Sequence, residues 1–256
     1  EDGIRDMQPV SAFLLNRSSD LREDPRIRSL NADAYHSRHA IIGPTIESCK
    51  AKFMGDDCTN ICGDYHMVMA CNGSKLRVVA KRRLNIQPGD PLEVVSYTGA
   101  RLPDAKAVRV SSPIGRMNAK ELEFLSKQRM HASFKQGKLG QVHEIEIDRA
   151  IDLPMGSIIA SATRMGNGFK VIGCDFGFNR SRGILIKASH GIVKDNRIQA
   201  CWGEAVKVSP EYWWLESGSS NDVAITGNTI TNCLGKGIAV YAIAGKGGMA
   251  PTGVHN

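Results

Sequence analysis

Long hydrophobic runs are missing from this sequence of 256 residues. No stretch approaches the roughly 18 apolar residues that a membrane-spanning helix needs, so we expect no membrane association. The chain also lacks an initiating Met and a charged-then-apolar leader, and its first residues resemble the middle of a domain. We therefore expect a fragment of a longer protein, in which the missing leader says little about location.

A disulfide framework is also missing. The seven cysteines are an odd number without framework spacing, and we expect them to act as small buried hydrophobes: Cys49, Cys58, Cys62, Cys71, Cys174, Cys201 and Cys233. A zinc site could be drawn from Cys58, Cys62, His66 and Cys71. That set lacks a Cys-x-x-Cys knuckle, so we expect no metal and no cofactor.

Aromatic residues make up only 6% of the chain, and they do not cluster with basic residues as in a nucleic-acid surface. The net charge of +7 comes entirely from residues 65–165, which hold 16 Lys/Arg and 9 Asp/Glu. The remainder holds 17 of each sign. An anionic partner could use this segment, but we interpret it as a solvated basic face and expect no nucleic-acid partner.

What the sequence does contain is an internal repeat with a period near 21 or 22 residues. Each copy has a short β-branched run ending near Ile46, Ile172, Val193 or Ile225, and then a marker residue: Cys49, Cys174, Asn196 or Asn228. A turn and a second short run follow. Residues 210–220 look like a loop inserted into this period. We expect Asn196 and Asn228 to form an internal ladder that satisfies corner backbone groups.

Short strands at this period, with Gly and Asn at the corners, predict an all-β fold: a right-handed parallel β-helix of the pectate-lyase-like solenoid type. Residues 65–165 break the repeat with alternating runs and turn signals, which predict an inserted antiparallel β-barrel or sandwich. NAKELEFLSKQ, residues 118–128, is the only predicted helix. The expected domains are 1–64 (first part of the β-helix, including an early coil through AFLLNRS), 65–165 (insert) and 166–256 (second part).

Three acids lie at one register of this repeat. Asp56 and Asp57 are adjacent in GDDCTNI, and Asp33 lies 23 residues before Asp56, about one coil. Neighbouring rungs of a sheet lie about 4.8 Å apart, so we expect Asp33 and Asp56 to stack and all three acids to cluster. Such a cluster is costly through like-charge repulsion unless it is used, and glycoside hydrolysis uses carboxylates in this way.

The same counting predicts the neighbours of the acids. The edge should continue through Arg180, Arg182 and Glu204, with Tyr35 and His36 one coil earlier. We expect these side chains to contact a sugar. Trp214 and Glu216, in the inserted loop, either stack against the substrate or pack the loop onto the solenoid. The three acids could instead bind calcium, but the arginines would compete with a cation.

One acid beside two others should have a raised pKa and act as a general acid, while the others stay ionised and orient a water. That division of roles favours inversion. The separations of the carboxylates decide between inversion and a covalent intermediate.

The motifs NADAYHS, GPTIESC and GDDCTNICGDY, followed by a β-domain and a return through NRSRGILI, resemble glycoside hydrolase family 110. The stretch EYWWLESGSSNDVAITGNTI is similar to that family as well. Cys62 departs from the family's pattern, in which a His is expected to contact the substrate.

The resemblance implies a β-helix with inserted barrel modules and an inverting, metal-free α-1,3-galactosidase. It implies Asp56 as general acid and Asp33 and Asp57 as holders of the water. It also implies an oligosaccharide or glycan partner and a secreted or periplasmic location.

Other functions stay open. A polysaccharide lyase would use Lys or Arg as base, usually with calcium. A polygalacturonase also pairs acids, but its Gly-His-Gly and Arg-Ile-Lys signatures are absent from the expected places. A non-catalytic carbohydrate-binding β-helix protein predicts that the three aspartates point apart or are paired with arginines.

Overall fold

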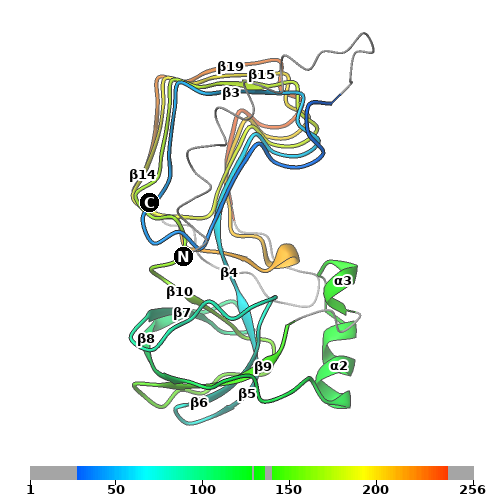
Figure 1. Cartoon of the computed structure of the whole chain (residues 1–256), viewed down its shortest axis with the longest axis vertical. Helices are drawn as coiled ribbons and strands as arrows, with labels where there is room; N and C mark the ends of the chain where they lie inside the picture. Colours follow the sequence, from blue (N-terminus) through cyan, green and yellow to red (C-terminus); the bar gives the residue numbers. More distant parts are fainter. Residues whose placement is uncertain (1–27, 129, 136–139, 242–256) are drawn as a thin grey trace.

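The computed structural model describes residues 28–128, 130–135 and 140–241. A stack of parallel strands forms one end of the elongated molecule and a barrel forms the other (Figure 1). Strand β4 (Thr59–Asp64) runs from the stack toward the barrel, and β5 (His66–Asn72) begins two residues after β4 ends.

The stack is a solenoid of three parallel sheets. The first contains β1 (Tyr35–Arg38), β4, β13 (Ile184–Ile186), β16 (Val206–Val208) and β20 (Ile238–Val240). The second contains β2 (Thr45–Glu47), β11 (Lys170–Ile172), β14 (Gly191–Lys194) and β18 (Val223–Thr226). The third contains β3 (Lys50–Lys52), β12 (Asp175–Gly177), β15 (Arg197–Gln199) and β19 (Thr229–Thr231).

A left-handed backbone residue turns the chain at each corner between the second and third sheets. The corner residue is Ser48, Gly173, Asp195 or Gly227, with φ of 52°, 62°, 53° and 66°. The marker residue of the repeat comes next in every coil. A second left-handed corner follows the third sheet at Phe53, Phe178, Ala200 and Asn232. These two corners explain why the strands of the second and third sheets are short. The residue that directly follows each strand has a positive φ, which an extended strand does not allow.

The predicted asparagine ladder is confirmed. The Asn196 side chain is buried, accepts from the Cys174 N–H at 2.9 Å, and donates to the Val171 carbonyl at 2.9 Å and to Asn228 Oδ1 at 2.8 Å. Asn228 Oδ1 also accepts from the Asn196 N–H at 3.0 Å. The ladder thus satisfies backbone groups that the corner would otherwise leave unpaired inside the solenoid.

The register of the second sheet shows which residue of β11 faces the solenoid interior. Val171, rather than Ile172, lies opposite Ile46 and Val193. Val171 is fully buried, whereas Ile172 is the last residue of β11 and lies on the other face of the sheet. The side-chain period of two in a strand makes this single-residue shift a change of face.

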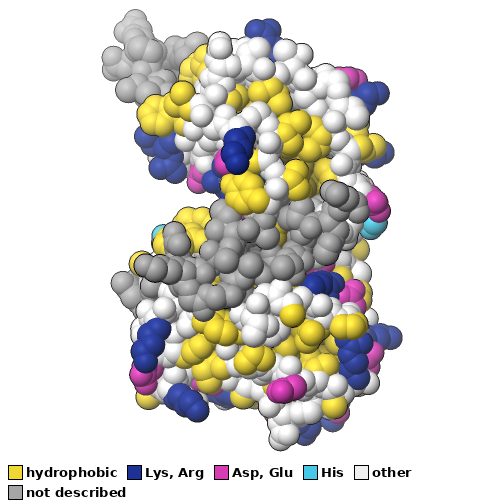
Figure 2. Space-filling model, turned by 180° about the vertical axis from the view of Figure 1, so that it is seen from behind, with side chains coloured by type: hydrophobic (Ala, Val, Ile, Leu, Met, Phe, Trp, Pro, Cys, Tyr) yellow, Lys and Arg dark blue, Asp and Glu magenta, His cyan; other side chains and the backbone are white. Residues whose placement is uncertain are grey.

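The inserted segment is a closed antiparallel barrel in the order β10-β5-β6-β9-β8-β7. Its remaining strands are β6 (Lys75–Val79), β7 (Pro91–Val95), β8 (Arg101–Val110), β9 (Val142–Ile147) and β10 (Ile158–Ser161). The barrel interior is a hydrophobic cluster of its own, which includes Val68, Leu76, Val94 and Ile145. On the face in Figure 2, basic side chains are scattered over both lobes, which fits a solvated basic surface.

The predicted helix is present as α2 (Ala119–Ser126), and Asn118 and Glu121 form its capping box. A second helix, α3 (Ala132–Lys135), was not predicted, because four residues are too short to show a periodic pattern.

The inserted loop contains a 3-10 turn, η1 (Tyr212–Trp214), and β17 (Glu216–Ser217). No helix in the described residues is long and apolar enough to cross a membrane. The early coil expected through residues 12–18 lies outside the described residues.

We predict that Asn196→Ala lowers the free energy of unfolding by about 2–4 kcal/mol, because it leaves the Cys174 N–H and the Val171 carbonyl buried without partners. Urea unfolding followed by circular dichroism measures this. Thr229→Ala, at an exposed position one rung further, is the matched control and should change stability by less than about 0.5 kcal/mol. An Asn196→Ala cost no larger than that of the control would contradict the ladder's role.

Candidate active site

Three aspartates meet at the turns that lead into the first sheet. Asp33 precedes β1, and Asp56 and Asp57 lie between β3 and β4. One carboxylate oxygen from each lies within 4.8 Å of the others. The acids therefore form the predicted cluster, well inside the separation of about 10 Å beyond which paired carboxyls rarely act together.

The stacking partner of Asp33 is Asp57, and the prediction of Asp56 is wrong by one residue. Tyr35 pairs with Thr59, so the coil here is 24 residues long and Asp33 lies opposite Asp57. The Asp57 N–H donates to Asp33 Oδ1 at 3.0 Å. Asp56 occupies the preceding position of the turn, where 43% of its side chain is exposed.

Asp57 is buried, at 1% exposure, and is held by Arg182. The Arg182 N–H donates to Asp57 Oδ1 at 2.7 Å, and the guanidinium lies 3.0 Å from Asp57 Oδ2. Burial raises the pKa of Asp57, and the nearby charge of Asp33 raises it further. The charge and the backbone N–H of Arg182 lower this pKa, and together these effects place the pKa at about 7. Asp57 can thus exchange a proton near neutral pH.

The other predicted residues of this edge are in register. Arg182 lies opposite Glu204 on the next rung, as the pairing of β13 with β16 requires. The Arg180 guanidinium is 3.8 Å from Asp56 Oδ2, and its side chain is more than half exposed. Glu204 accepts a hydrogen bond from the Tyr241 hydroxyl at 3.0 Å.

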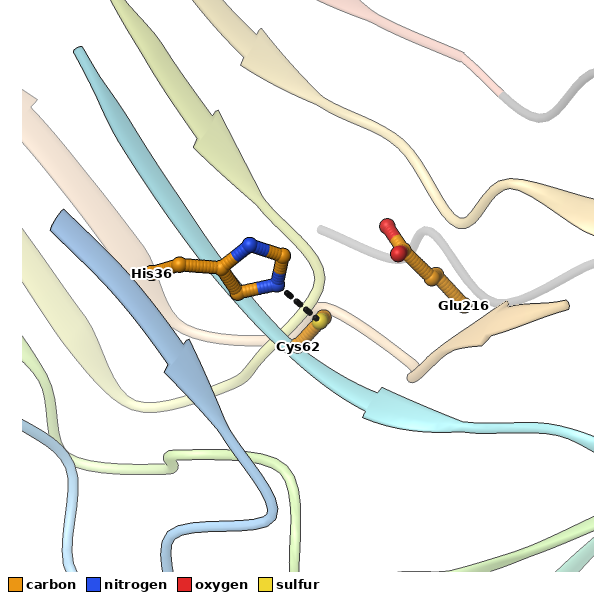
Figure 3. Close-up of side chains that lie close together, drawn as sticks. All are labelled: His36, Cys62 and Glu216. Carbon is orange, nitrogen blue, oxygen red and sulfur yellow. Dashed lines mark hydrogen bonds between the residues drawn. The ribbon is translucent and has the colours of Figure 1, made fainter. Parts of the chain in front are cut away.

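His36 connects the acid cluster to a cysteine. Its Nδ1 is 2.8 Å from Asp33 Oδ2, and its Nε2 is 3.6 Å from Cys62 Sγ (Figure 3). Burial opposes the charged form of His36, but the hydrogen bonds to Asp33 and Cys62 outweigh it and raise the pKa to about 9. The ion pair with the imidazolium holds the Asp33 carboxylate in a fixed position.

Tyr35 is a correction to the predicted site. The residue is on the inward face of β1, opposite Thr59, and its ring lies 6.1 Å from the ring of Phe176 in the solenoid interior. Because side chains of a strand alternate between faces, Tyr35 and His36 cannot both face outward.

Glu216 is also not free on the surface. Its Oε1 is 2.8 Å from Arg38 and 3.3 Å from Lys81, and its Oε2 is 2.5 Å from Lys187. Trp214 remains partly exposed, but its ring stacks on His131 of the inserted domain, with centroids 4.2 Å apart. The packing alternative therefore accounts for much of the inserted loop.

A chain of buried ion pairs, which we did not predict from the sequence, runs beneath the acids. Glu211 links the Arg182 guanidinium, at 3.6 Å, to Lys187, at 3.3 Å. Burial alone would raise the pKa of Glu211, but the surrounding cations lower it to about 2. The chain continues from Lys187 through Glu216 to Lys81, which follows barrel strand β6 and lies 3.0 Å from Asp64 Oδ1.

The signal for this network was weak but present. Lys187 follows the apolar strand Ile184–Ile186 directly, and the Lys187 side chain is fully buried. A lysine continuing a buried apolar run requires a charged partner. The partner, however, is supplied by the inserted loop, which the repeat could not align.

Two groups of side chains in the described residues have metal-ligating atoms close together: Asp33, Asp56 and Asp57, and His36, Cys62 and Glu216. The second group comes from three elements, β1, β4 and β17 (Figure 3). Arg38, Lys81 and Lys187 already surround Glu216, and Arg180 and Arg182 already lie beside the aspartates. These cations oppose a further positive charge at either group.

The fold defines the class: this is a right-handed parallel β-helix with an inserted antiparallel barrel. The β-helix itself is a fold common among carbohydrate-active enzymes. Residues 155–247 match the family model described as a right handed beta helix region. No curated protein matches the chain.

We predict a pH-dependent contribution of His36 to stability. Its pKa is about 9 in the folded protein and about 6.5 in the unfolded chain, so the stabilisation is complete below about pH 6.5 and is lost as pH rises through 9. His36→Gln should therefore cost about 1–2 kcal/mol more at about pH 6 than above about pH 9.5, allowing for partial exposure. Urea unfolding at both pH values tests this, and a cost independent of pH would contradict the His36–Asp33 pair.

Proposed function

We propose that the protein is an inverting, exo-acting glycoside hydrolase that releases terminal α-1,3-linked galactose. The observation that carries the proposal is the convergence of three carboxylates on one turn edge of a β-helix, one of them exposed and one with a pKa near neutrality. The sugar and linkage, and a secreted or periplasmic location, rest on the resemblance to glycoside hydrolase family 110.

The resemblance implies Asp56 as the general acid, and its exposed side chain can reach a glycosidic oxygen. The raised pKa that we expected of the general acid falls instead on the buried Asp57, one of the two acids proposed to hold the water. Asp33 and Asp57 are the proposed holders of the water. Their backbone link and their partners His36 and Arg182 keep both carboxylates in fixed positions. The water attacks the anomeric carbon while Asp56 gives its proton to the leaving oxygen, and a water-holding carboxylate accepts the proton of the water.

Inverting enzymes separate their two carboxyl groups by about 6.5–9.5 Å to make room for a water. One oxygen each of Asp33, Asp56 and Asp57 lies closer to the others than that, within 4.8 Å. The stereochemical outcome is therefore the sharpest test of the division of roles.

An α-1,3-galactosyl oligosaccharide should give β-galactose as the first product in an NMR time course. Asp56→Asn should lower kcat by roughly a thousandfold, because the leaving oxygen then receives no proton. Asp195→Asn, at a corner of the solenoid far along the chain from the acids, is the control and should leave kcat unchanged. Early α-galactose would contradict inversion, and release from other glycans alone would contradict the galactose assignment.

Activity should fall as pH drops below about 7, because protonation of Asp57 removes one of the two carboxylates that hold the water. Arg182→Met removes the charge that lowers the pKa of Asp57, so the acid limb of kcat/KM should move upward by about one pH unit. Arg197→Met, an exposed position on β15, is the control. An unmoved limb would mean that Asp57 is not the titrating group.

A non-catalytic carbohydrate-binding protein is the second candidate. The ion pair between Asp57 and Arg182 favours it, because paired acids are what that function predicts. Binding of galactosyl glycans without release of sugar from any member of a glycan panel would identify this function. A polysaccharide lyase would instead lose its activity with a chelator.

A further inference from the structure

The turn that carries Asp56 is repeated on the next three rungs of the solenoid. Residues 54–57 are followed by 179–182, 201–204 and 233–236. Backbone hydrogen bonds join them: Arg180 N–H to the Met54 carbonyl at 3.1 Å, Trp202 N–H to the Asn179 carbonyl at 3.1 Å, and Leu234 N–H to the Cys201 carbonyl at 2.9 Å. The acid cluster is therefore the first part of a longer, regular edge.

Glycines allow these turns to stack closely. A Cβ on Gly235 would lie 2.5 Å from the backbone of Gly203, and one on Gly203 would lie 3.1 Å from the backbone of Ser181. With no side chain at Gly203 or Gly235, the neighbouring side chains of the edge carry its surface chemistry.

Trp202 is the most exposed tryptophan of the described residues, at 70%, and it follows Arg180 by one rung. Arg180 in turn follows Gly55, the residue before Asp56. An exposed indole ring offers a flat apolar face on which a ligand can stack. Trp202 lies two rungs beyond Asp56 and Asp57, which is a separation of roughly 10 Å along the solenoid axis.

Polar groups accompany Trp202 along the same edge. Asp57, Arg182, Glu204 and Lys236 occupy equivalent positions on successive rungs, with alternating charge. An apolar ring beside hydrogen-bonding groups of both signs matches a sugar, which presents C–H groups on one face and hydroxyls at its edge. Leu234, at the equivalent position one rung beyond Trp202, is also exposed, at 77%. The charged residues Glu204 and Lys236 follow Trp202 and Leu234 by two positions each, whereas the centre of a protein interface is depleted of charge.

We propose that Trp202 forms a subsite for the second sugar beyond the cleaved bond, on the leaving-group side of the substrate. This inference rests on the proposed function and specifies its substrate as an oligosaccharide of at least three units. The chain of the substrate lies along the solenoid axis, and each rung advances about 4.8 Å, close to the advance of one sugar unit. Arg180, between Asp56 and Trp202, faces the first sugar beyond the cleaved bond.

The test compares a disaccharide and a trisaccharide that share the same terminal α-1,3-galactosyl bond. The wild type should have a higher kcat/KM for the trisaccharide, and Trp202→Ala should lower that value roughly tenfold while leaving the disaccharide value unchanged. Trp202→Phe should recover part of the loss. Ile192→Ala, an exposed position on β14, is the control and should change neither value.

Binding to Asp56→Asn, measured by calorimetry with the same two sugars, separates the possible failures. If neither sugar binds and neither is cleaved, the proposed function fails. If the wild type cleaves both sugars, and Trp202→Ala has an unchanged melting temperature and keeps the wild-type preference for the trisaccharide, the subsite is refuted. The proposed hydrolase function then still stands. If the trisaccharide binds without cleavage and Trp202→Ala weakens it, Trp202 serves a carbohydrate-binding protein, which overturns the leaving-group assignment.

Discussion

The in-register stacking of successive coils is the constraint on which the rest of the structure depends. Two left-handed corners per coil fix the length of each strand, and the ladder of Asn196 and Asn228 fixes which residues face inward. The same register brings Asp33, 24 residues away in sequence, against the backbone of Asp57. A shift of one residue would turn His36 inward and separate the acids.

The insertion of the barrel does not interrupt this register, because β4 and β13 pair directly although 119 residues separate their ends. The barrel contributes Lys81 to the buried chain of ion pairs that begins at Asp57 and Arg182. Buried charges of this kind hold their geometry only while every partner is present. The barrel and the inserted loop therefore support the acids from behind, while the solenoid supplies the acids themselves.

The repeat made the solenoid and the acid cluster predictable, and the alternating runs that break the repeat made the barrel strands predictable, because short β-branched runs and turn residues are local signals. Positions within the turns were less predictable. Asp56 was aligned with Asp33 in place of Asp57, and Tyr35 was expected on the same face as His36, since counting residues does not fix the length of a turn. The partners of Glu216 and the stacking of Trp214 on His131 depend on how the loop folds back over β4, for which the sequence has no periodic signal.

The central claim is that the three aspartates surround the reacting bond. A crystal structure of Asp56→Asn with an α-1,3-galactosyl trisaccharide tests it most directly. We expect the terminal galactose at the aspartates, with its glycosidic oxygen within hydrogen-bonding distance of the substituted amide side chain at position 56 and a water held between Asp33 and Asp57. A trisaccharide bound with its scissile bond away from these residues would contradict it.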